Sequence, residues 1–422
     1  MRHHHVLNIV LAFFLCTIDT AFAQTIEVVP NRVLFDEPAV IHVTGLQSKE
    51  QISIQAELKD GAGEDWTSRA DFMADAQGTV DVAKQAPVSG SYKEVSAMGL
   101  VWSMRPVSKS VNIYRAPGNV QEIQFWLIRR GERVADTRLE QLRLADGVQR
   151  TKLVEPLHGF LFKPNTNGPH PAVLVVGGSG GGVPTFEALW LASHGYAALA
   201  LAYFHYESLP PLLEAIPLEY FGQAIQWMMN RPDIIPDRIA VLGGSRGGEL
   251  ALQLGSMYPQ LHAVVAYVPA DVRYGSCCGQ THVPYAWTWK GQPAVYMSPG
   301  LSPNSTTAQQ AAIAVEQTHG PILMISGTDD GIWHSSTMAD SVVSRLKRTH
   351  FPYPFEHLRY PHAGHSAGYP ETVPAWRGPQ RHPISGKEID FGGSVAGNAL
   401  SSIDAAPKVL GFLDRSLKSP VK

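Results

Sequence analysis

Two patterns of hydrophobic and polar residues divide the chain. From residue 24 to about residue 155, short runs of alternating apolar and polar residues are separated by turn residues, as at 39–44, 51–58 and 121–127. Alternation with a period of two places every second side chain on the same face of a strand. This region is therefore predicted to be an antiparallel β-sandwich.

From about residue 156 the pattern changes. Continuous apolar runs at 171–176, 197–202 and 239–242 alternate with longer segments of helical spacing. Strands that are apolar on both faces and separated by helices are typical of a parallel sheet covered by helices. The sequence thus predicts two folded domains, a β-sandwich over residues 24–155 and an α/β domain over residues 156–422.

The first 23 residues have a pattern of their own. An apolar run at 9–18 follows Arg2 and precedes Ala21-Phe22-Ala23. The run is too short for a membrane-spanning helix of about 20 residues, and small residues around Phe22 are typical of a signal-peptide cleavage site. We expect a signal peptide cleaved after Ala23 and a secreted or periplasmic enzyme without a membrane span. A buried first strand and an uncleaved anchor are the alternatives.

Composition and charge exclude several classes of protein. The chain has 34 basic and 37 acidic residues among 422, a formal charge of −3, which gives no electrostatic footprint for nucleic acid. Three cysteines are too few for a disulfide scaffold or a four-thiolate zinc site. Cleavage after Ala23 would leave only Cys277 and Cys278, which either stay free or pair with each other in an oxidising compartment. A globular enzyme is expected.

The segment Gly243-Gly-Ser245-Arg-Gly247 matches Gly-x-Ser-x-Gly, the tight strand-to-helix turn that exposes a nucleophilic serine. The segment 177–181 matches the same pattern around Ser179. Context separates the two, because Ser245 lies between an apolar strand and a segment of helical spacing. Ser179 is followed by three glycines, Val183 and Pro184, which cannot open a helix at once. We predict Ser245 as the nucleophile.

The glycine-rich run 177–182 follows the predicted strand 171–176. Backbone N–H groups after this strand and after the nucleophile form the oxyanion hole in enzymes with such a turn. We predict the N–H of Arg246 together with that of Ser179 or Gly180. A phosphate-binding loop is the alternative, but the run lacks the nucleotide fingerprints.

A serine hydroxyl needs an imidazole base, and the base needs an orienting carboxylate. The expected order along the chain is Ser, Asp, His. Asp330 follows the predicted strand 321–326 and is taken as the acid, with Asp329 as the alternative. His365 follows the next predicted strand and is taken as the base, with His362 as the alternative.

The pair His362 and His365 also raises the question of a metal site. Pro361 and Gly364 disfavour the helix that a His-x-x-x-His zinc site uses, and the sequence offers no obvious third ligand. We therefore predict neither a metal nor an organic cofactor.

A loop after the predicted strand 263–268 is rich in aromatic residues and is expected to border the site. Aromatic side chains at the carboxyl ends of parallel strands can line an acyl or aromatic pocket, although ordinary loop packing explains them equally well. The predicted pocket residues are Tyr274, Tyr285, Trp287 and Trp289.

With these motifs the chain resembles the type I acyl-CoA thioesterases and the bile acid-CoA:amino acid N-acyltransferases. The resemblance covers almost the whole chain after residue 23. It is carried by Leu34-Phe-Asp-Glu-Pro38, Met98-Gly-Leu-Val-Trp-Ser-Met-Arg-Pro106, Leu218-Glu-Tyr-Phe221, Gly243-Gly-Ser-Arg-Gly-Gly-Glu-Leu250, Asp329-Asp330 with Trp333, and Gly364-His365.

The resemblance implies a β-sandwich packed on an α/β-hydrolase domain, with a triad at Ser245, Asp330 and His365. In this family a serine nucleophile accompanies hydrolysis, and a cysteine accompanies transfer to an amine. The expected activity is therefore hydrolysis of a small-molecule acyl thioester through an acyl-enzyme. A carboxylesterase acting on oxygen esters, an N-acyltransferase and a catalytically silent binding module are the alternatives. The sequence does not indicate an oligomeric state.

Overall fold

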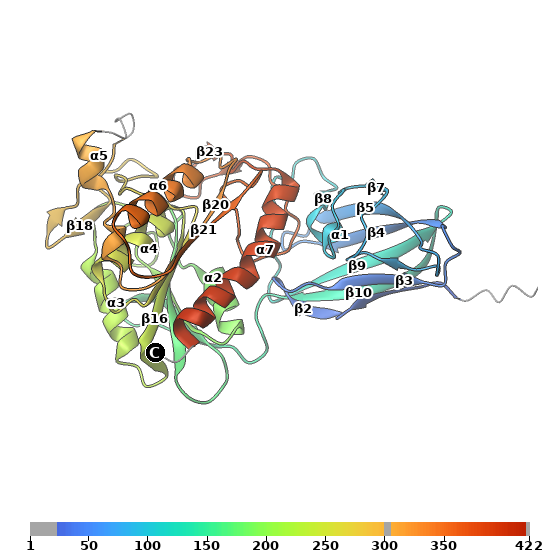
Figure 1. The fold of residues 1–422 in the computed structure, drawn as a ribbon, viewed down its shortest axis with the longest axis horizontal. Coiled ribbons are helices and arrows are strands. Elements are labelled where there is room, and N and C mark those ends of the chain that lie inside the picture. Colours follow the sequence, from blue (N-terminus) through green and yellow to red (C-terminus); the bar gives the residue numbers. More distant parts are fainter. Residues whose placement is uncertain (1–22, 299–304, 419–422) are drawn as a thin grey trace, which may run out of the picture.

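The computed structural model describes residues 23–298 and 305–418, which form two bodies side by side (Figure 1). The smaller body contains the strands from β1 to β10, coloured blue to cyan in Figure 1. The larger one contains one large mixed sheet with helices on both faces, and two small sheets, one formed by β15 (Ile216–Pro217), β18 (Trp287–Trp289) and β19 (Gln292–Pro293) and the other by β22 (Gln380–Arg381) and β23 (Glu388–Ile389). The predicted class, an α/β domain with an N-terminal antiparallel β-sandwich, is confirmed.

The sandwich consists of two sheets with the strand orders β1-β3-β6 and β2-β10-β9-β4-β5-β7. In the central strand β9, every second side chain is buried, as the alternating sequence pattern predicts. All strand pairings of the sandwich are antiparallel except that of β10 with β2. The strands are β1 (Thr25–Val29), β2 (Arg32–Leu34), β3 (Val40–Thr44), β4 (Gln51–Lys59), β5 (Asp65–Met73), β6 (Val80–Asp81), β7 (Ser89–Gly90), β8 (Arg105–Pro106, paired with β5), β9 (Val120–Arg129) and β10 (Glu132–Leu142), and the short helix α1 is Gly99–Trp102.

The larger body is built on an eight-stranded sheet of order β11-β12-β14-β13-β16-β17-β20-β21. From β14 to β21 all neighbours are parallel, whereas β11 and β12 are antiparallel. Its strands are β11 (Gln149–Lys152), β12 (His158–Lys163), β13 (His170–Val176), β14 (Ala197–Ala202), β16 (Ile234–Gly244), β17 (Ala263–Tyr267), β20 (Ile322–Gly327) and β21 (Phe355–Tyr360). Strand β11, which lies before residue 156, thus already belongs to this sheet.

Helices cover both faces of the sheet because its strands are apolar on both faces. On one face, Leu174 and Val176 pack in a cluster with helices α3, α4 and α6; on the other, Val173 and Val175 pack with α2 and α7. The helices are α2 (Thr185–Ser193), α3 (Glu219–Met229), α4 (Arg246–Met257), α5 (Thr306–Ala311), α6 (Ser335–Arg348) and α7 (Val395–Leu413). No helix within the described residues is long and apolar enough to cross a membrane.

The two bodies are tied together by polar contacts of the sandwich with the α/β body. Asp36 accepts a hydrogen bond from Trp190 Nε1 at 2.9 Å and lies 2.8 Å from His194 Nε2. Gln141 donates to the backbone carbonyl of Thr372 at 3.0 Å. These contacts fix the sandwich against helix α2 (Thr185–Ser193) and against the segment that follows strand β21.

The order of the strands decides where a ligand can bind. After β13 the chain crosses to β14 on one side and then returns to β16 on the other. Loops that leave two such strands in opposite directions open a crevice at the carboxyl end of the sheet. The glycine-rich run 177–182 follows β13, and Ser245 follows β16, so both lie at this crevice.

Candidate active site

Ser245 occupies a sharp turn between β16 and α4. Its backbone has φ 59° and ψ −122°, a conformation that a residue with a side chain rarely adopts. The turn is held by a 2.9 Å hydrogen bond from the Ser245 N–H to the carbonyl of Tyr267, and α4 begins at the next residue. The strain therefore belongs to the one residue whose hydroxyl the turn exposes.

Two glycines allow the turn to close. A Cβ on Gly243 would lie 2.2 Å from the carbonyl oxygen of Gly247. A Cβ on Gly247 would lie 2.5 Å from that of Val176 and 2.6 Å from that of Gly177. These neighbours are backbone atoms, which cannot rotate away, so the sequence pattern around Ser245 is a steric requirement.

Gly247→Ala should lower the free energy of unfolding by at least about 2 kcal/mol, because the new methyl group overlaps two backbone carbonyls. Gly118→Ala is the matched control, since a Cβ there meets nothing within 4 Å, and its effect should stay within about 0.5 kcal/mol. Urea unfolding of the two variants measures the difference. Equal stabilities would contradict the steric account.

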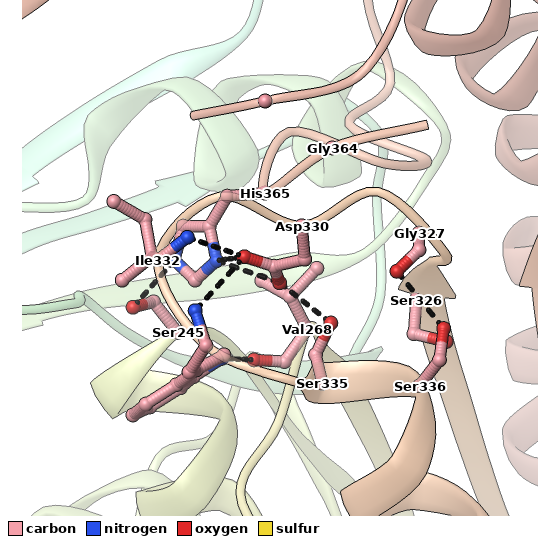
Figure 2. A network of polar contacts seen from close by, with 12 residues as sticks. Ser245, Val268, Ser326, Gly327, Asp330, Ile332, Ser335, Ser336, Gly364 and His365 are labelled. Atoms are coloured by element: carbon pink, nitrogen blue, oxygen red, sulfur yellow. Dashed lines mark hydrogen bonds and ion pairs between the residues drawn. The ribbon is translucent and has the colours of Figure 1, made fainter. Parts of the chain in front are cut away.

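The structure brings Ser245, His365 and Asp330 together (Figure 2). His365 Nε2 lies 2.8 Å from Ser245 Oγ, and His365 Nδ1 lies 2.9 Å from each carboxylate oxygen of Asp330. Asp330 follows β20 and His365 follows β21, two adjacent parallel strands whose carboxyl ends meet at one edge. This geometry would allow Ser245 to act as a nucleophile, His365 as its base and Asp330 as the acid that orients the imidazole.

Asp330 is fixed by groups other than His365. Ser335 Oγ donates to its carboxylate at 2.6 Å, and the backbone N–H groups of Ile332 and Trp333 donate at 2.9 and 3.2 Å (Figure 2). Burial alone would raise the pKa of Asp330, but the hydrogen bond and the charge attraction of His365, with the bonds from Ser335 and Ile332, hold it below its ordinary value. Asp330 is therefore a carboxylate at neutral pH.

The lowered pKa of Asp330 has a consequence for acid stability. Its contribution is complete above the unfolded-state pKa of about 3.9 and is lost as the pH falls through the lower folded-state pKa. The difference in Tm between the parent and Asp330→Asn should therefore shrink as the pH falls below about 4. Calorimetry at pH 7 and pH 3 tests this, and a difference that grows with acid would contradict the sign.

The alternative residues form a separate pair at the surface. His362 Nδ1 lies 3.4 Å from Asp329, with side-chain exposures of 77% and 49%. The corresponding values for His365 and Asp330 are 5% and 2%. Only the second pair is shielded from water, and only the second pair reaches Ser245.

A second Ser–His–Asp arrangement lies nearby, but its serine is completely buried. Ser326 Oγ is 2.7 Å from His357 Nε2, and His357 Nδ1 is 3.0 Å from Asp340. Ser326 has no exposed surface, and its hydroxyl also contacts Ser336 at 2.8 Å (Figure 2). No substrate can reach Ser326, so this cluster ties β20, β21 and α6 together rather than doing chemistry.

Ser245 opens onto a cavity of about 1300 Å³. Its walls come from the glycine-rich loop, from the loop after β17, from the segment after β21 and from the sandwich through Arg143. Of the residues predicted to line a pocket, Tyr274 does so, together with Cys277 and Cys278, which are joined by a disulfide. Tyr274 stacks on Trp333, whose indole packs edge-on against His365.

Ser179, Gly180 and Arg246 line the same cavity. The N–H of Arg246 is at the first position of α4, where a helix offers no internal partner. In the described part of the chain no backbone hydrogen bond involves the N–H groups of Ser179 and Gly180. These amides, with the positive end of the helix dipole, can stabilise an anion beside Ser245.

Three of the predicted pocket residues do not line this cavity: Tyr285, Trp287 and Trp289. Trp287 lies in the core and donates its indole N–H to the buried Glu249 at 2.8 Å. Trp289 packs edge-on against Tyr258. The expectation that these three aromatics border the cavity is corrected. The strand β18 (Trp287–Trp289) turns Trp287 and Trp289 toward α3 and α4.

Several residues that build the site were not predicted from the sequence. Phe391 lies against the ring of His365, and its carbonyl accepts the His365 N–H at 2.7 Å. Asn398 on α7 accepts the N–H of Gly364 at 2.7 Å. Ser335 alone could have been found from the sequence. A carboxylate that comes just before the start of a helix commonly accepts hydrogen bonds from donors in the first turn. No group of three or more potential metal ligands gathers among the described residues.

The fold and this site define an enzyme of the α/β-hydrolase class. The family model for the "BAAT / Acyl-CoA thioester hydrolase C terminal" region matches residues 216–419, and that for the "Acyl-CoA thioester hydrolase/BAAT N-terminal region" matches residues 36–155. The chain belongs to this acyl-CoA thioester hydrolase and BAAT family.

Curated relatives match over nearly the whole chain. Human acyl-coenzyme A thioesterase 2, mitochondrial, is 28% identical over 92% of this chain and 83% of its own length. The mouse peroxisomal succinyl-coenzyme A thioesterase is 29% identical over 94% of this chain and 98% of its own. Among solved structures, a dienelactone hydrolase-like promiscuous phosphotriesterase from metagenomic libraries has a TM-score of 0.41 at 16% identity, covering 64% of this chain and 98% of that one.

The prediction of a secreted or periplasmic enzyme is wrong. Relatives that match more than nine-tenths of the chain are named for mitochondria and peroxisomes. The prediction depended on one short apolar run followed by small residues, which is a local sequence pattern. The proposed signal peptide, residues 1–23, lies outside the described residues except for Ala23.

Proposed function

We propose that this chain is a serine-dependent acyl-CoA thioesterase that works through an acyl-enzyme on Ser245. Thioester hydrolysis follows from the family to which the chain belongs. The finer proposal, the residues and the intermediate, is supported by one observation above all: Ser245 Oγ lies 2.8 Å from His365 Nε2 at the wall of a large cavity.

The geometry suggests the role of each group in the reaction. His365 Nε2 accepts the proton of Ser245 as Oγ attacks the thioester carbonyl, and Asp330 holds Nδ1 protonated so that Nε2 is free to accept. The C–S bond then breaks, and the thiol leaves with the proton from Nε2. Water, deprotonated by the same nitrogen, hydrolyses the acyl-enzyme and releases the acid.

Negative charge on the carbonyl oxygen must be stabilised in both steps. The N–H of Arg246 and those of Ser179 and Gly180 are the proposed donors, since they line the cavity and lack backbone partners. Removing one such donor commonly costs about 10²–10³ in kcat. Backbone donors cannot be deleted by substitution of side chains, so their role is best tested with tetrahedral inhibitors.

The direct test is hydrolysis of matched acyl-CoA and nitrophenyl esters by purified protein. A thioesterase should have a kcat/KM for acyl-CoA at least about tenfold above that for the oxygen ester of the same acyl chain, because the CoA part supplies binding energy. Free thiol, measured with a thiol reagent, reports hydrolysis of acyl-CoA, and released nitrophenolate reports hydrolysis of the ester. A preference for oxygen esters would favour a carboxylesterase and contradict the proposal.

A trapping experiment separates hydrolysis from acyl transfer. With glycine added to the reaction, an N-acyltransferase would form the acyl-glycine amide, whereas a hydrolase should still release the free acid. Hydroxylamine, a stronger nucleophile, should capture the acyl-enzyme as the hydroxamate at the expense of the acid. We expect hydroxamate but no glycine conjugate by mass spectrometry; a glycine conjugate as the main product would contradict hydrolysis.

A further inference from the structure

The cavity contains a second serine–histidine contact, away from Ser245. Ser179 Oγ lies 3.1 Å from His382 Nε2, and both residues line the cavity. Ser179 belongs to the glycine-rich loop after β13, and His382 follows strand β22 (Gln380–Arg381), which forms a hairpin with β23 (Glu388–Ile389). The hairpin therefore places an imidazole against the loop that carries the proposed oxyanion donors.

The hairpin determines which nitrogen of His382 carries the proton. The backbone N–H groups of Ile384 and Ser385 point to Nδ1 at 3.3 and 3.2 Å. Because both are donors, Nδ1 must be an acceptor, and a neutral imidazole then carries its hydrogen on Nε2. Burial lowers the pKa of His382 below its ordinary value, which keeps the ring neutral at pH 7.

The direction of the contact with Ser179 follows. His382 Nε2–H donates, and Ser179 Oγ accepts, so the hydroxyl keeps its own hydrogen for another partner. Within the described residues no other polar group contacts Ser179 Oγ. The hydrogen of the Ser179 hydroxyl is therefore available for donation to a ligand in the cavity.

The loop that carries Ser179 also approaches the nucleophile. A Cβ built on the preceding residue, Gly178, would lie 3.4 Å from Ser245 Cβ and 3.9 Å from Ser245 Oγ. The loop thus touches the nucleophile at the residue next to Ser179. The polar atom of an acyl substrate that must come to this place is the carbonyl oxygen under attack.

We propose that the Ser179 hydroxyl is a side-chain donor to the carbonyl oxygen of the acyl substrate as negative charge develops on it, and that His382 is the positioning residue that directs this hydroxyl. The inference depends on the proposed function, since it assumes attack by Ser245. It adds a side-chain donor to the backbone amides and assigns a role to the hairpin.

The first test compares Ser179→Ala with Ser179→Thr, which keeps a hydroxyl. Ser179→Ala should lower kcat about 10–100-fold with little change in KM, because a bond made only in the transition state is lost. Its affinity for an alkyl boronic acid, which forms a tetrahedral adduct with a serine, should fall by a similar factor, whereas Ser179→Thr should retain most of both. Ser208→Ala is the matched control, since Ser208 is exposed and lies 3.5 Å from His158 outside the cavity.

The second test asks whether His382 acts through Ser179. His382→Leu should reproduce the loss in kcat, and combining it with Ser179→Ala should add almost nothing further, because both remove the same bond. His382→Gln, which offers an amide donor in place of Nε2–H, should restore part of kcat and covers the case in which the leucine variant does not fold. Additive losses would mean that His382 only supports the hairpin and would overturn its positioning role.

The outcomes separate this inference from the proposed function. If Ser179→Ala keeps the parent kcat while Ser245→Ala is inactive, the donor is refuted and the nucleophile stands. If Ser245→Ala keeps the parent activity, the proposed function itself is refuted. A rise in KM alone in Ser179→Ala would also overturn the inference, because it would place the hydroxyl in ground-state binding.

Discussion

Ser245→Ala should lower kcat for acyl-CoA hydrolysis at least about 10⁴-fold, because Ser245 is the cavity hydroxyl that contacts the buried pair of His365 and Asp330. The cavity and the oxyanion donors remain, so KM should change little. Initial-rate measurements with thiol detection give both constants. Labelling by a fluorophosphonate probe, which reacts with an activated serine, should disappear in parallel.

Ser326→Ala is the control for this result. Ser326 has the same histidine contact at 2.7 Å but no exposed surface. Its removal leaves His357 Nε2 without Ser326 as a partner, while Nδ1 keeps Asp340, and should destabilise the fold by about 1–3 kcal/mol while kcat stays at the parent value. If Ser326→Ala abolished labelling and Ser245→Ala did not, the assignment of the nucleophile would be reversed.

Asp330→Asn should lower kcat about 10⁴-fold while the fold is kept. The asparagine amide can donate to His365 Nδ1, which would then be an acceptor, and the ring hydrogen would move to Nε2. A protonated Nε2 cannot take the proton of Ser245. Steady-state kinetics and the rate of fluorophosphonate labelling should both show the loss, with KM nearly unchanged.

The neighbouring carboxylate provides the control. Asp329 is exposed and pairs with His362 rather than with His365. Asp329→Asn should therefore leave kcat unchanged, although it differs from Asp330→Asn by one position. A larger loss in Asp329→Asn would show that the wrong carboxylate had been assigned to His365.

Much of the fold could be predicted from local patterns. The apolar run 197–202 is β14 with both ends correct, because a strand buried on both faces has a continuous apolar sequence and no competing helical signal. The run 239–242 is only the buried end of β16, which begins at Ile234. Its first half includes Pro236, Asp237 and Arg238, so no apolar pattern marked it.

The functions of single aromatic residues could not be predicted in the same way. Tyr274, Trp287 and Trp289 lie in the same aromatic-rich segment after β17, but only Tyr274 of the three lines the cavity. Trp287 is drawn into the core because its indole N–H satisfies the carboxylate of Glu249, which is completely buried. That partner lies 38 residues away, and nothing in the loop itself reveals it.

The sequence by itself determined the turn at Ser245. Only glycine fits at positions 243 and 247, because a Cβ at either position would lie within 2.5 Å of a backbone carbonyl oxygen. It also determined the order of nucleophile, acid and base along the chain. The tertiary structure alone decided which carboxylate and which imidazole lie next to Ser245. Asp330 and His365 are 35 residues apart, and His365 is 120 residues from Ser245. Parallel pairing of β20 with β21 brings them to one edge, and burial keeps water from His365 and Asp330 while leaving Asp329 and His362 in solvent.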